Sequence, residues 1–541
     1  MTLSTADHRA AEQICQPPQI NIPRRYNAAY DLLARNATWP EKPAFINAIS
    51  GKVLSYGELT HQSYQFANVL RLLGFAPDSR VLIAMLDTPD WPVVFLGCIL
   101  AGVVPIAAST LLTTADFEFM LRDSRAQGLV VSKALLPAFE PLMDNIDSLK
   151  TVVVAKESET ADSAPNSLKN HDLAQLIRAQ ATTENIAVEV FDSCADDACF
   201  WLYSSGSTGA PKGTVHLHSH LIQTAELYGR GVLGIQHSDV VYSAAKLFFA
   251  YGLGNALTFP MSVGATTVLL PSRPTPMDVF IILKDFQPTI FYGVPTLYAA
   301  LLADPARPAK TEINLRICTS AGEALPAELG RQFSAAYGVE VLDGIGSTEM
   351  LHIFLSNRPG AVRYGTTGQA VPGYQLRIIG DDGKDCAVGE IGELHISGPT
   401  SAIMYWNNRA KTKAIFAGDW TKSGDKYTLS ADGYYTYCGR SDDMLKVGGI
   451  YVSPFEVEAC LMAHPAVLEV AVIGVKDADD LVKPKAYVVL KSGQTASADE
   501  LKAHVRQHLA AYKYPRWVDF LSELPKTATG KIQRFKLRQS K

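Results

Sequence analysis

Tyr203-Ser-Ser-Gly-Ser-Thr-Gly-Ala-Pro-Lys-Gly213 is the stretch of sequence that tells most about the fold of this chain. It offers many hydroxyl and backbone N–H groups with little side-chain bulk, and Lys212 follows a proline. Amides in a turn form a concavity that binds anions, and a lysine adds a point charge, so the stretch suits a polyphosphate. Its spacing differs from G-x-x-x-x-G-K-[ST], because Pro211 stands where the second glycine belongs. The apolar run at residues 199–203 predicts a buried strand that leads into this loop.

Four further segments combine small residues with single charged side chains. They are Asp343-Gly-Ile-Gly-Ser-Thr-Glu349, Ser423-Gly-Asp425 with Asp432-Gly-Tyr-Tyr435, Gly439-Arg-Ser-Asp-Asp-Met-Leu-Lys-Val-Gly-Gly449, and Pro525-Lys-Thr-Ala-Thr-Gly-Lys531. With the first stretch they resemble, in the same order, the motifs of the acyl-adenylate-forming superfamily. That superfamily includes acyl- and aryl-CoA synthetases, nonribosomal adenylation domains and beetle luciferases. The resemblance extends from about residue 26 to the end of the chain.

The composition is that of a soluble protein with more than one domain. The 541 residues exceed one ordinary core, and a net charge of −5 gives no reason to expect nucleic acid or an anionic membrane as a partner. The eight cysteines form no CxxC pair and no His/Cys cluster with zinc spacing, which favours free thiols in a cytoplasmic protein. The N-terminus lacks a signal-peptide pattern. The apolar run at 92–108 is too short to span a bilayer and predicts a buried helix followed by a strand.

Two units are expected: a large N-terminal domain of layered α/β sheets (residues 1–440) and a small, mobile α+β C-terminal domain (441–541). Strands are predicted at 80–85, 128–132, 151–154, 266–270, 289–292 and 315–319, with helical patterns between them. In the second unit, strands at 470–474 and 486–490 are predicted to flank a turn at Lys483-Pro484. A helix follows Ser497, which forms a capping-box pattern with Glu500. Residues 157–169 are predicted to be a solvated loop.

The resemblance implies a site for ATP and coenzyme A. The implied phosphate-binding residues are Ser204, Ser205, Gly206, Ser207, Thr208, Gly209 and Lys212. The implied adenine-binding residues are Gly322, Glu323, Ala324, Asp343, Gly344, Ile345 and Gly346. Asp425 and Arg440 would bind the ribose, and Gly448 and Gly449 would approach the pantetheine of coenzyme A. Ile345 departs from the family, which usually has an aromatic residue there to stack on adenine.

Adenylation brings an anionic carboxylate to an anionic phosphate, so its barrier is electrostatic and needs no general base. The resemblance assigns Lys531 as the cation between the two reactants, Thr348 as a phosphate donor, Glu349 as a Mg²⁺ ligand and Asp442 as the hinge of the C-terminal domain. Two plainer interpretations stay open. Ser347-Thr-Glu349 also suits the first turn of a helix, and Lys531 is also compatible with a solvated basic tail.

The acid is expected to be small and aromatic. Residues 243–260 and 349–357 resemble those of benzoate–CoA ligases and related aryl-CoA ligases. Aromatic side chains of Tyr228, Phe248, Phe249 and Tyr251 could wall a flat apolar slot, with Lys246 or His352 as its polar group. Aromatic clusters of this kind are more often plain core.

The predicted function is therefore an AMP-forming aromatic acid–CoA ligase. ATP and a benzoate-like carboxylate would give aryl-AMP and pyrophosphate, and coenzyme A would then give aryl-CoA and AMP after rotation of the C-terminal domain. Because the sequence ends soon after Lys531, coenzyme A is favoured over an adjoining carrier module. The alternatives are a fatty acid–CoA ligase, a stand-alone adenylation domain, a luciferase-like oxygenase and a non-catalytic nucleotide-binding regulator. The chain is expected to be a monomer or a homodimer.

Overall fold

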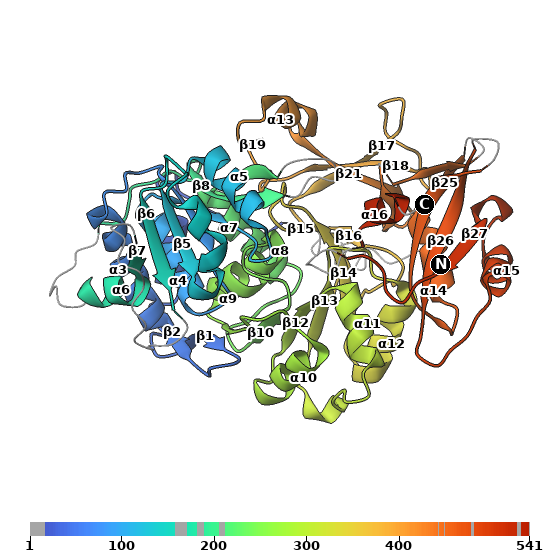
Figure 1. Cartoon of the computed structure of the whole chain (residues 1–541), viewed down its shortest axis with the longest axis horizontal. Helices are drawn as coiled ribbons and strands as arrows, with labels where there is room; N and C mark the ends of the chain where they lie inside the picture. The colour runs from blue at the N-terminus through green and yellow to red at the C-terminus, as the bar shows by residue number, and fades with distance from the viewer. Residues whose placement is uncertain are drawn as a thin grey trace, which may run out of the picture.

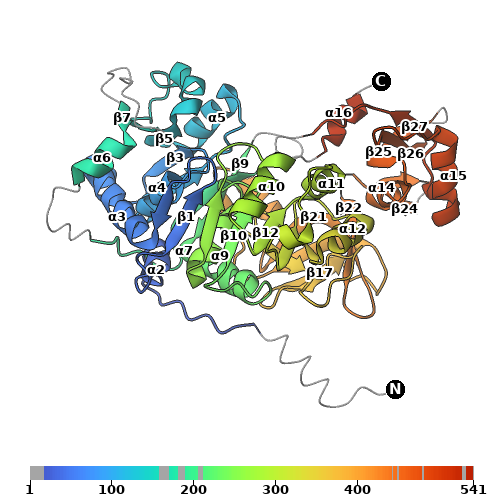
Figure 2. The same cartoon turned by 90° about the horizontal axis from the view of Figure 1, so that it is seen from below.

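The computed structural model describes residues 17–156, 170–180, 189–204, 211–441, 443–447, 450–477, 481–526 and 532–539. A large body of α/β layers occupies most of the chain, and a smaller C-terminal unit, drawn in red, lies beside it (Figures 1 and 2). This arrangement confirms the predicted fold class. Among the described residues, no helix is both long and apolar enough to cross a membrane.

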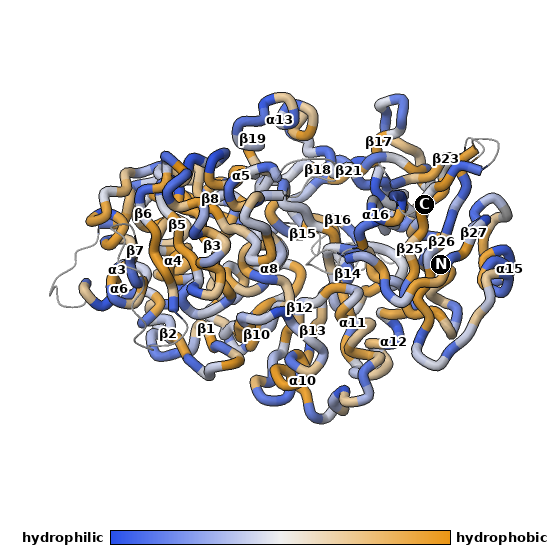
Figure 3. Tube along the Cα trace, in the orientation of Figure 1, coloured by the Kyte–Doolittle hydropathy of each residue, from blue (hydrophilic) through white to orange (hydrophobic). Residues whose placement is uncertain are grey.

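The first sheet has the strand order β19-β9-β8-β4-β3-β5-β6-β7. Its strands are β3 (Arg80–Ala84), β4 (Val104–Ala107), β5 (Gly128–Ser132), β6 (Thr151–Ala155), β7 (Asn170–Asp172), β8 (Ala198–Ser204), β9 (Lys212–Leu217) and β19 (Met404–Tyr405). Pairs within β8-β4-β3-β5-β6-β7 are parallel. Successive side chains alternate between two cores: Val130 of β5 lies in one, and Leu129 and Val131 in the other. Figure 3 shows the hydrophobic colour along β5 and helix α4 (Asp90–Leu100).

The second sheet has the order β16-β15-β14-β13-β12-β10-β11-β1-β2. Its strands are β1 (Pro43–Asn47), β2 (Val53–Ser55), β10 (Val240–Ser243), β11 (Thr266–Leu269), β12 (Ile290–Gly293), β13 (Ile317–Ser320), β14 (Val341–Gly346), β15 (Ile353–Ser356) and β16 (Gln369–Ala370). The strands from β1 to β14 along this order pair in parallel. Their carboxyl ends therefore meet at one edge, which is where open α/β sheets bind ligands.

A third sheet and the C-terminal unit complete the strands. The third sheet contains β17 (Gln375–Ile379), β18 (Gly392–Ser397), β20 (Phe416–Ala417), β21 (Trp420–Leu429) and β22 (Tyr435–Arg440). The C-terminal unit contains a ladder of β23 (Leu445–Val447) and β24 (Ile450–Val452), and a sheet of β25 (Val467–Lys476), β26 (Val482–Leu490) and β27 (Trp517–Phe520). A separate core, which includes Leu445, Val472 and Val488, holds this unit together.

The other helices are α2 (Ala28–Ala34), α3 (Tyr56–Leu72), α5 (Thr114–Ser124), α6 (Leu173–Gln180), α7 (His218–Thr224), α8 (Ala250–Leu253), α9 (Phe259–Val263), α10 (Pro276–Asp285), α11 (Pro295–Ala303), α12 (Ala327–Tyr337), α13 (Arg409–Ile415), α14 (Pro454–Met462), α15 (Ala498–His508) and α16 (Arg534–Gln539). Two short π-helical segments, η3 (Ala225–Arg230) and η4 (Gly254–Thr258), extend α7 and α8. The predicted capping box of Ser497 and Glu500 begins α15.

Most predicted elements are confirmed, and one is wrong. The six strands predicted in the large domain are β3, β5, β6, β11, β12 and β13, and the run at 92–108 forms most of α4 and then β4. Lys483 and Pro484 were predicted to form a turn but lie inside β26. Pro484 precedes Lys485, where pairing with β27 begins, so its missing N–H removes no hydrogen bond from that ladder. The loop predicted at 157–169 lies outside the described residues.

Candidate active site

The phosphate-loop stretch joins two neighbouring strands. Strand β8 leads in and β9 leads out, and Ser204 pairs with Lys212 in their antiparallel register. The predicted residues Ser205, Gly206, Ser207, Thr208 and Gly209 lie outside the described residues. The two described ends of the loop, Ser204 and Lys212, both approach the segment that follows β14.

Glu349 is the point at which these groups meet. Its Oε1 accepts hydrogen bonds from the Tyr405 hydroxyl at 2.7 Å and the Ser204 hydroxyl at 3.4 Å. The Lys212 ammonium lies 4.7 Å from the centroid of the Tyr405 ring. Burial lowers the pKa of Lys212, and the Glu349 carboxylate opposes that shift. A carboxylate, hydroxyl oxygens and one cation thus share a small region, which fits a hard cation bridged to phosphate.

Thr348 is held by a buried histidine of the neighbouring sheet. The His216 Nε2 donates to the Thr348 carbonyl oxygen at 2.7 Å, and its Nδ1 lies 3.0 Å from the Nδ1 of His220. Residues 347–352 form turns and bends between β14 and β15, so no helix begins at Ser347-Thr-Glu349. No motif indicated this role of His216, because its partner is 132 residues away.

The stability of the protein should fall in mild acid because of these histidines. Burial lowers the pKa of His216 to about 4, so the unfolded state, with a pKa of about 6.5, binds the proton first. The contribution of His216 to the free energy of unfolding is fully present above about pH 6.5 and is lost as the pH falls towards 4. At pH 5 the free energy of unfolding is lower by about 2 kcal/mol. The His216→Gln variant retains an N–H donor and should lose about that much pH dependence in urea unfolding between pH 7 and pH 5. An unchanged dependence would contradict this assignment.

The predicted ribose-binding pair is assembled across β21 and β22. Asp425 faces Arg440 in the register, and Arg440 Nη1 donates to Asp425 Oδ1 at 3.3 Å and to the Ser423 carbonyl at 3.1 Å. Gly424 has φ of +73°, and a Cβ there would lie 2.9 Å from Arg440 Nη2. Glycine therefore permits the close approach of this guanidinium group to the turn.

The predicted adenine-binding residues lie where β13 and β14 end. Asp343 is buried, and its Oδ1 accepts from the Leu325 N–H at 3.3 Å; burial raises its pKa well above the usual value. Gly344 is buried, whereas Ile345 and Gly346 are partly exposed. Gly322 is exposed at a φ of +90°, and Glu323 and Ala324 follow it. The Glu323 Oε1 accepts from the Ile532 N–H at 3.1 Å, so the C-terminal unit reaches this edge.

A ring cluster lies beside these strand ends. The His352 ring centroid is 5.5 Å from that of Tyr228, 5.6 Å from Tyr251 and 4.5 Å from Phe259. The Tyr251 hydroxyl contacts Thr319 Oγ1 at 2.5 Å. Tyr228 lies on η3, and a Cβ on Gly254 of η4 would lie 2.3 Å from His352 Cδ2. Both π-helical segments thus bound the cluster, and such segments often occur at functional sites.

The cluster contains polar atoms without hydrogen-bond partners among the described residues. These buried atoms are His352 Nδ1, Asn255 Nδ2 and the Oη of Tyr292, whose ring lies against that of Tyr251. His352 Nε2 lies 3.2 Å from both the Tyr251 carbonyl and Asn255 Oδ1, and burial lowers its pKa to about 3, so the ring is neutral. Asn255 was not predicted, although it lies in the segment 243–260 that carried the aryl-ligase resemblance. A bound polar group would satisfy such atoms.

Two further predicted pocket residues have contacts of their own. The Lys246 ammonium donates to the carbonyls of Leu270 and Ser272, just beyond the end of β11. Buried Asp87 is nearby and accepts from the Leu247 N–H at 3.3 Å, which holds this loop. Phe248 is buried against Phe249, with ring centroids 4.6 Å apart. Asp442, Gly448, Gly449 and Lys531 lie outside the described residues.

Comparisons with known proteins agree with this geometry. Residues 32–406 match the family of AMP-binding enzymes, and residues 456–531 match the AMP-binding enzyme C-terminal domain. The chain is 56% identical over 544 residues to a benzoate–CoA ligase of Thauera aromatica, with 100% of both chains covered. It is 47% identical over 523 residues to a 4-hydroxybenzoate–CoA/benzoate–CoA ligase of Rhodopseudomonas palustris, with 95% and 94% covered. A solved benzoate CoA ligase from Burkholderia xenovorans has a TM-score of 0.87 and 50% identity, covering 95% of this chain and 100% of that one. The chain therefore belongs to the AMP-binding enzyme family.

Proposed function

We propose that this enzyme is an AMP-forming ligase that joins benzoate, or a closely related aromatic acid, to coenzyme A in the cytoplasm. The observation that carries the proposal is the ring cluster of Tyr228, Tyr251 and His352, whose two tyrosines interact electrostatically with the buried Asp343. A flat, mostly apolar site with a few polar atoms fits an aryl carboxylate. The names of the full-length relatives support the same substrate class.

In the first half-reaction, a carboxylate oxygen of the acid attacks the α-phosphorus of ATP and pyrophosphate leaves. The phosphate oxygens would be bound by Lys212, Ser204 and Thr348. Asp425 would accept hydrogen bonds from the ribose hydroxyls, and Arg440 would hold the Asp425 carboxylate in place. Glu349, with the hydroxyl oxygens around it, would hold Mg²⁺. When bound, that ion supplies positive charge to the phosphate oxygens.

In the second half-reaction, the thiol of coenzyme A loses its proton and attacks the acyl carbon, and AMP leaves. We assign the pivot between the two steps to Asp442, after a domain boundary at residue 440, and the approach of pantetheine to Gly448 and Gly449. Lys531 would neutralise the reactants in the first step and move away before the second. These assignments rest on the resemblance of the motifs.

A panel of acids with ATP, Mg²⁺ and coenzyme A tests the substrate class by the AMP formed. Benzoate and its hydroxy and amino derivatives should be used in preference to hexanoate and octanoate. Gly254→Ala places a methyl group against His352, so the ring must move, and kcat/KM for benzoate should fall about 10–100-fold because a misplacement of about 1 Å in a site can cost about 10²-fold. The KM for ATP should stay unchanged. Preference for the aliphatic acids would make the enzyme a fatty acid–CoA ligase instead.

A further inference from the structure

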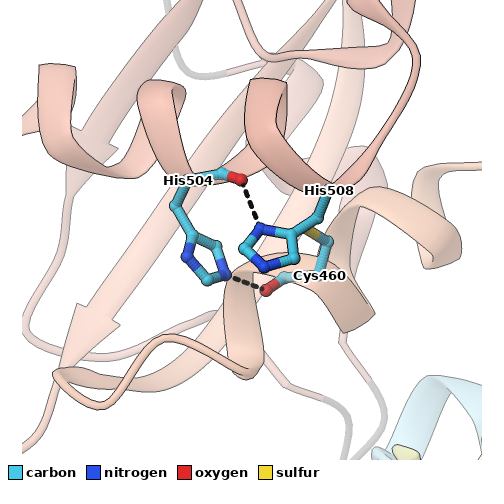
Figure 4. Close-up of side chains that lie close together, drawn as sticks. All are labelled: Cys460, His504 and His508. Atoms are coloured by element: carbon cyan, nitrogen blue, oxygen red, sulfur yellow. Dashed lines mark hydrogen bonds between the residues drawn. The ribbon is translucent and has the colours of Figure 1, made fainter.

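A second set of polar side chains comes together in the C-terminal unit, on helices α14 and α15. Cys460 lies on α14, and His504 and His508 lie on α15. Figure 4 shows both imidazole rings on the side of α15 that faces Cys460. One ligand atom from each residue lies within 4.8 Å of those from the other two. We propose that these three side chains bind a divalent transition-metal ion of the zinc class.

The donor set has the right chemistry for such an ion. Thiolate and imidazole ligands suit Zn²⁺ and related borderline-soft ions, whereas Mg²⁺ prefers oxygen. Zn–N bonds of about 2.0 Å and Zn–S bonds of about 2.3 Å place two imidazole nitrogens and one thiolate about 3.3–3.6 Å apart around a tetrahedral ion. The three groups must therefore approach one another by up to about 1.5 Å. His508 is exposed and can make this adjustment by small changes in its side-chain torsion angles, and water can complete the coordination.

Hydrogen bonds already orient the two rings. His508 Nδ1 donates to the His504 carbonyl at 2.8 Å, which leaves the lone pair of Nε2 available to a metal. His504 Nε2 lies 3.0 Å from the Cys460 carbonyl. An ion bound through Nδ1 of His504 would leave the hydrogen bond from Nε2 to the Cys460 carbonyl intact. An ion bound through Nε2 would take the place of the Nε2 proton and so remove this hydrogen bond. Burial and the neighbouring His508 and His464 lower the pKa of His504, so its ring is neutral and able to bind.

The two helices form a rigid support for the site. Val457 and Leu461 of α14 and Leu501 and Val505 of α15 are completely buried in one shared core. Sites built on packed helices keep their geometry better than sites on loops.

Burial and Glu456, which pairs with Lys513 at 2.6 Å, raise the pKa of the Cys460 thiol. Metal binding must therefore release a proton from the thiol and should strengthen as the pH rises.

The test uses untagged, full-length enzyme, stripped with a chelator and kept in Mg²⁺. Co²⁺ serves as a spectroscopic probe of thiolate ligation, and Zn²⁺ serves as the competitor. We expect one bound Co²⁺ ion, with a thiolate-to-cobalt absorption band that Zn²⁺ removes. Zn²⁺ should also slow the alkylation of Cys460, measured by mass spectrometry, about tenfold or more. His508→Ala and His504→Gln should weaken binding about 10–100-fold or more.

His464→Gln is the matched control, because it removes an imidazole whose ring lies 5.3 Å from that of His504 but is outside the proposed ligand set. This variant should bind the metal as the wild type does. The exposed His508 allows its alanine variant to fold, which thermal unfolding without metal verifies. Equal binding by wild type and His508→Ala, no Zn²⁺ protection of Cys460, or an equal loss in His464→Gln would each overturn the proposal.

Discussion

Replacing Lys531 with alanine should slow aryl-AMP formation about 10²–10³-fold, while supplied aryl-AMP and coenzyme A should still be converted at close to the wild-type rate. The first step brings together two anions, and a positioned cation stabilises the charge that develops between them. Loss of one such preorganised group typically has an effect of this size. The second step uses a different nucleophile and needs no cation at that place.

The described residues on either side of Lys531 support this prediction. Lys526 and Ile532 form an antiparallel bridge, and the Gln533 N–H donates to the Pro525 carbonyl at 2.8 Å. The two described flanks of Lys531 therefore lie side by side. The Ile532 N–H donates to Glu323, in the segment that follows β13, so the flank after Lys531 contacts the predicted adenine-binding edge.

The matched control for this experiment is Lys526→Ala. Lys526 belongs to the same terminal segment, but its ammonium pairs with Glu469 of β25 at 2.5 Å. Its loss should leave adenylation close to wild type. Isotope exchange between ATP and pyrophosphate measures the first step, and consumption of synthetic benzoyl-AMP with coenzyme A measures the second. Equal loss of both steps in Lys531→Ala would contradict the assigned role.

The parts of the fold that were predictable are those with strong local patterns. Strand β5 and helix α4 are continuous apolar runs, so burial on both faces identifies them. Pro484 misled the prediction because proline usually signals a turn, and only the register with β27 shows why a strand accepts it. The π-helical segments η3 and η4 have no distinct hydrophobic period, so the sequence could not show them.

The candidate site was predictable where short motifs supply its groups. Ser204 and Lys212 come from one motif and Glu349 from another, and the structure brings the three close together. The contacts that orient these groups join residues far apart in the chain, so no motif contains them. Tyr405 is 56 residues from Glu349 and belongs to strand β19 of the other large sheet. Likewise, no motif indicated that the Lys246 ammonium donates to the carbonyls of Leu270 and Ser272.

The carboxylate of Glu349 should be nearly as important as Lys531. In Glu349→Gln, the amide oxygen can still accept the hydrogen bond from Tyr405, so the turn after β14 should keep its shape. The negative charge, however, is lost. We expect ATP–pyrophosphate exchange to fall about 10²–10³-fold, and the Mg²⁺ concentration for half-maximal rate to rise about tenfold or more.

Tyr405→Phe distinguishes the effect of the Glu349 charge on the rate from the effect of the hydrogen bond that orients the Glu349 side chain. This variant keeps the carboxylate and removes only the hydroxyl that donates to Oε1 at 2.7 Å, so its loss of rate should be several-fold and its Mg²⁺ requirement should change little. Titration of Mg²⁺ at saturating ATP and benzoate distinguishes the two variants. If Glu349→Gln kept the wild-type Mg²⁺ requirement, the carboxylate would not be the ligand, and its contacts with Ser204 and Lys212 would be structural.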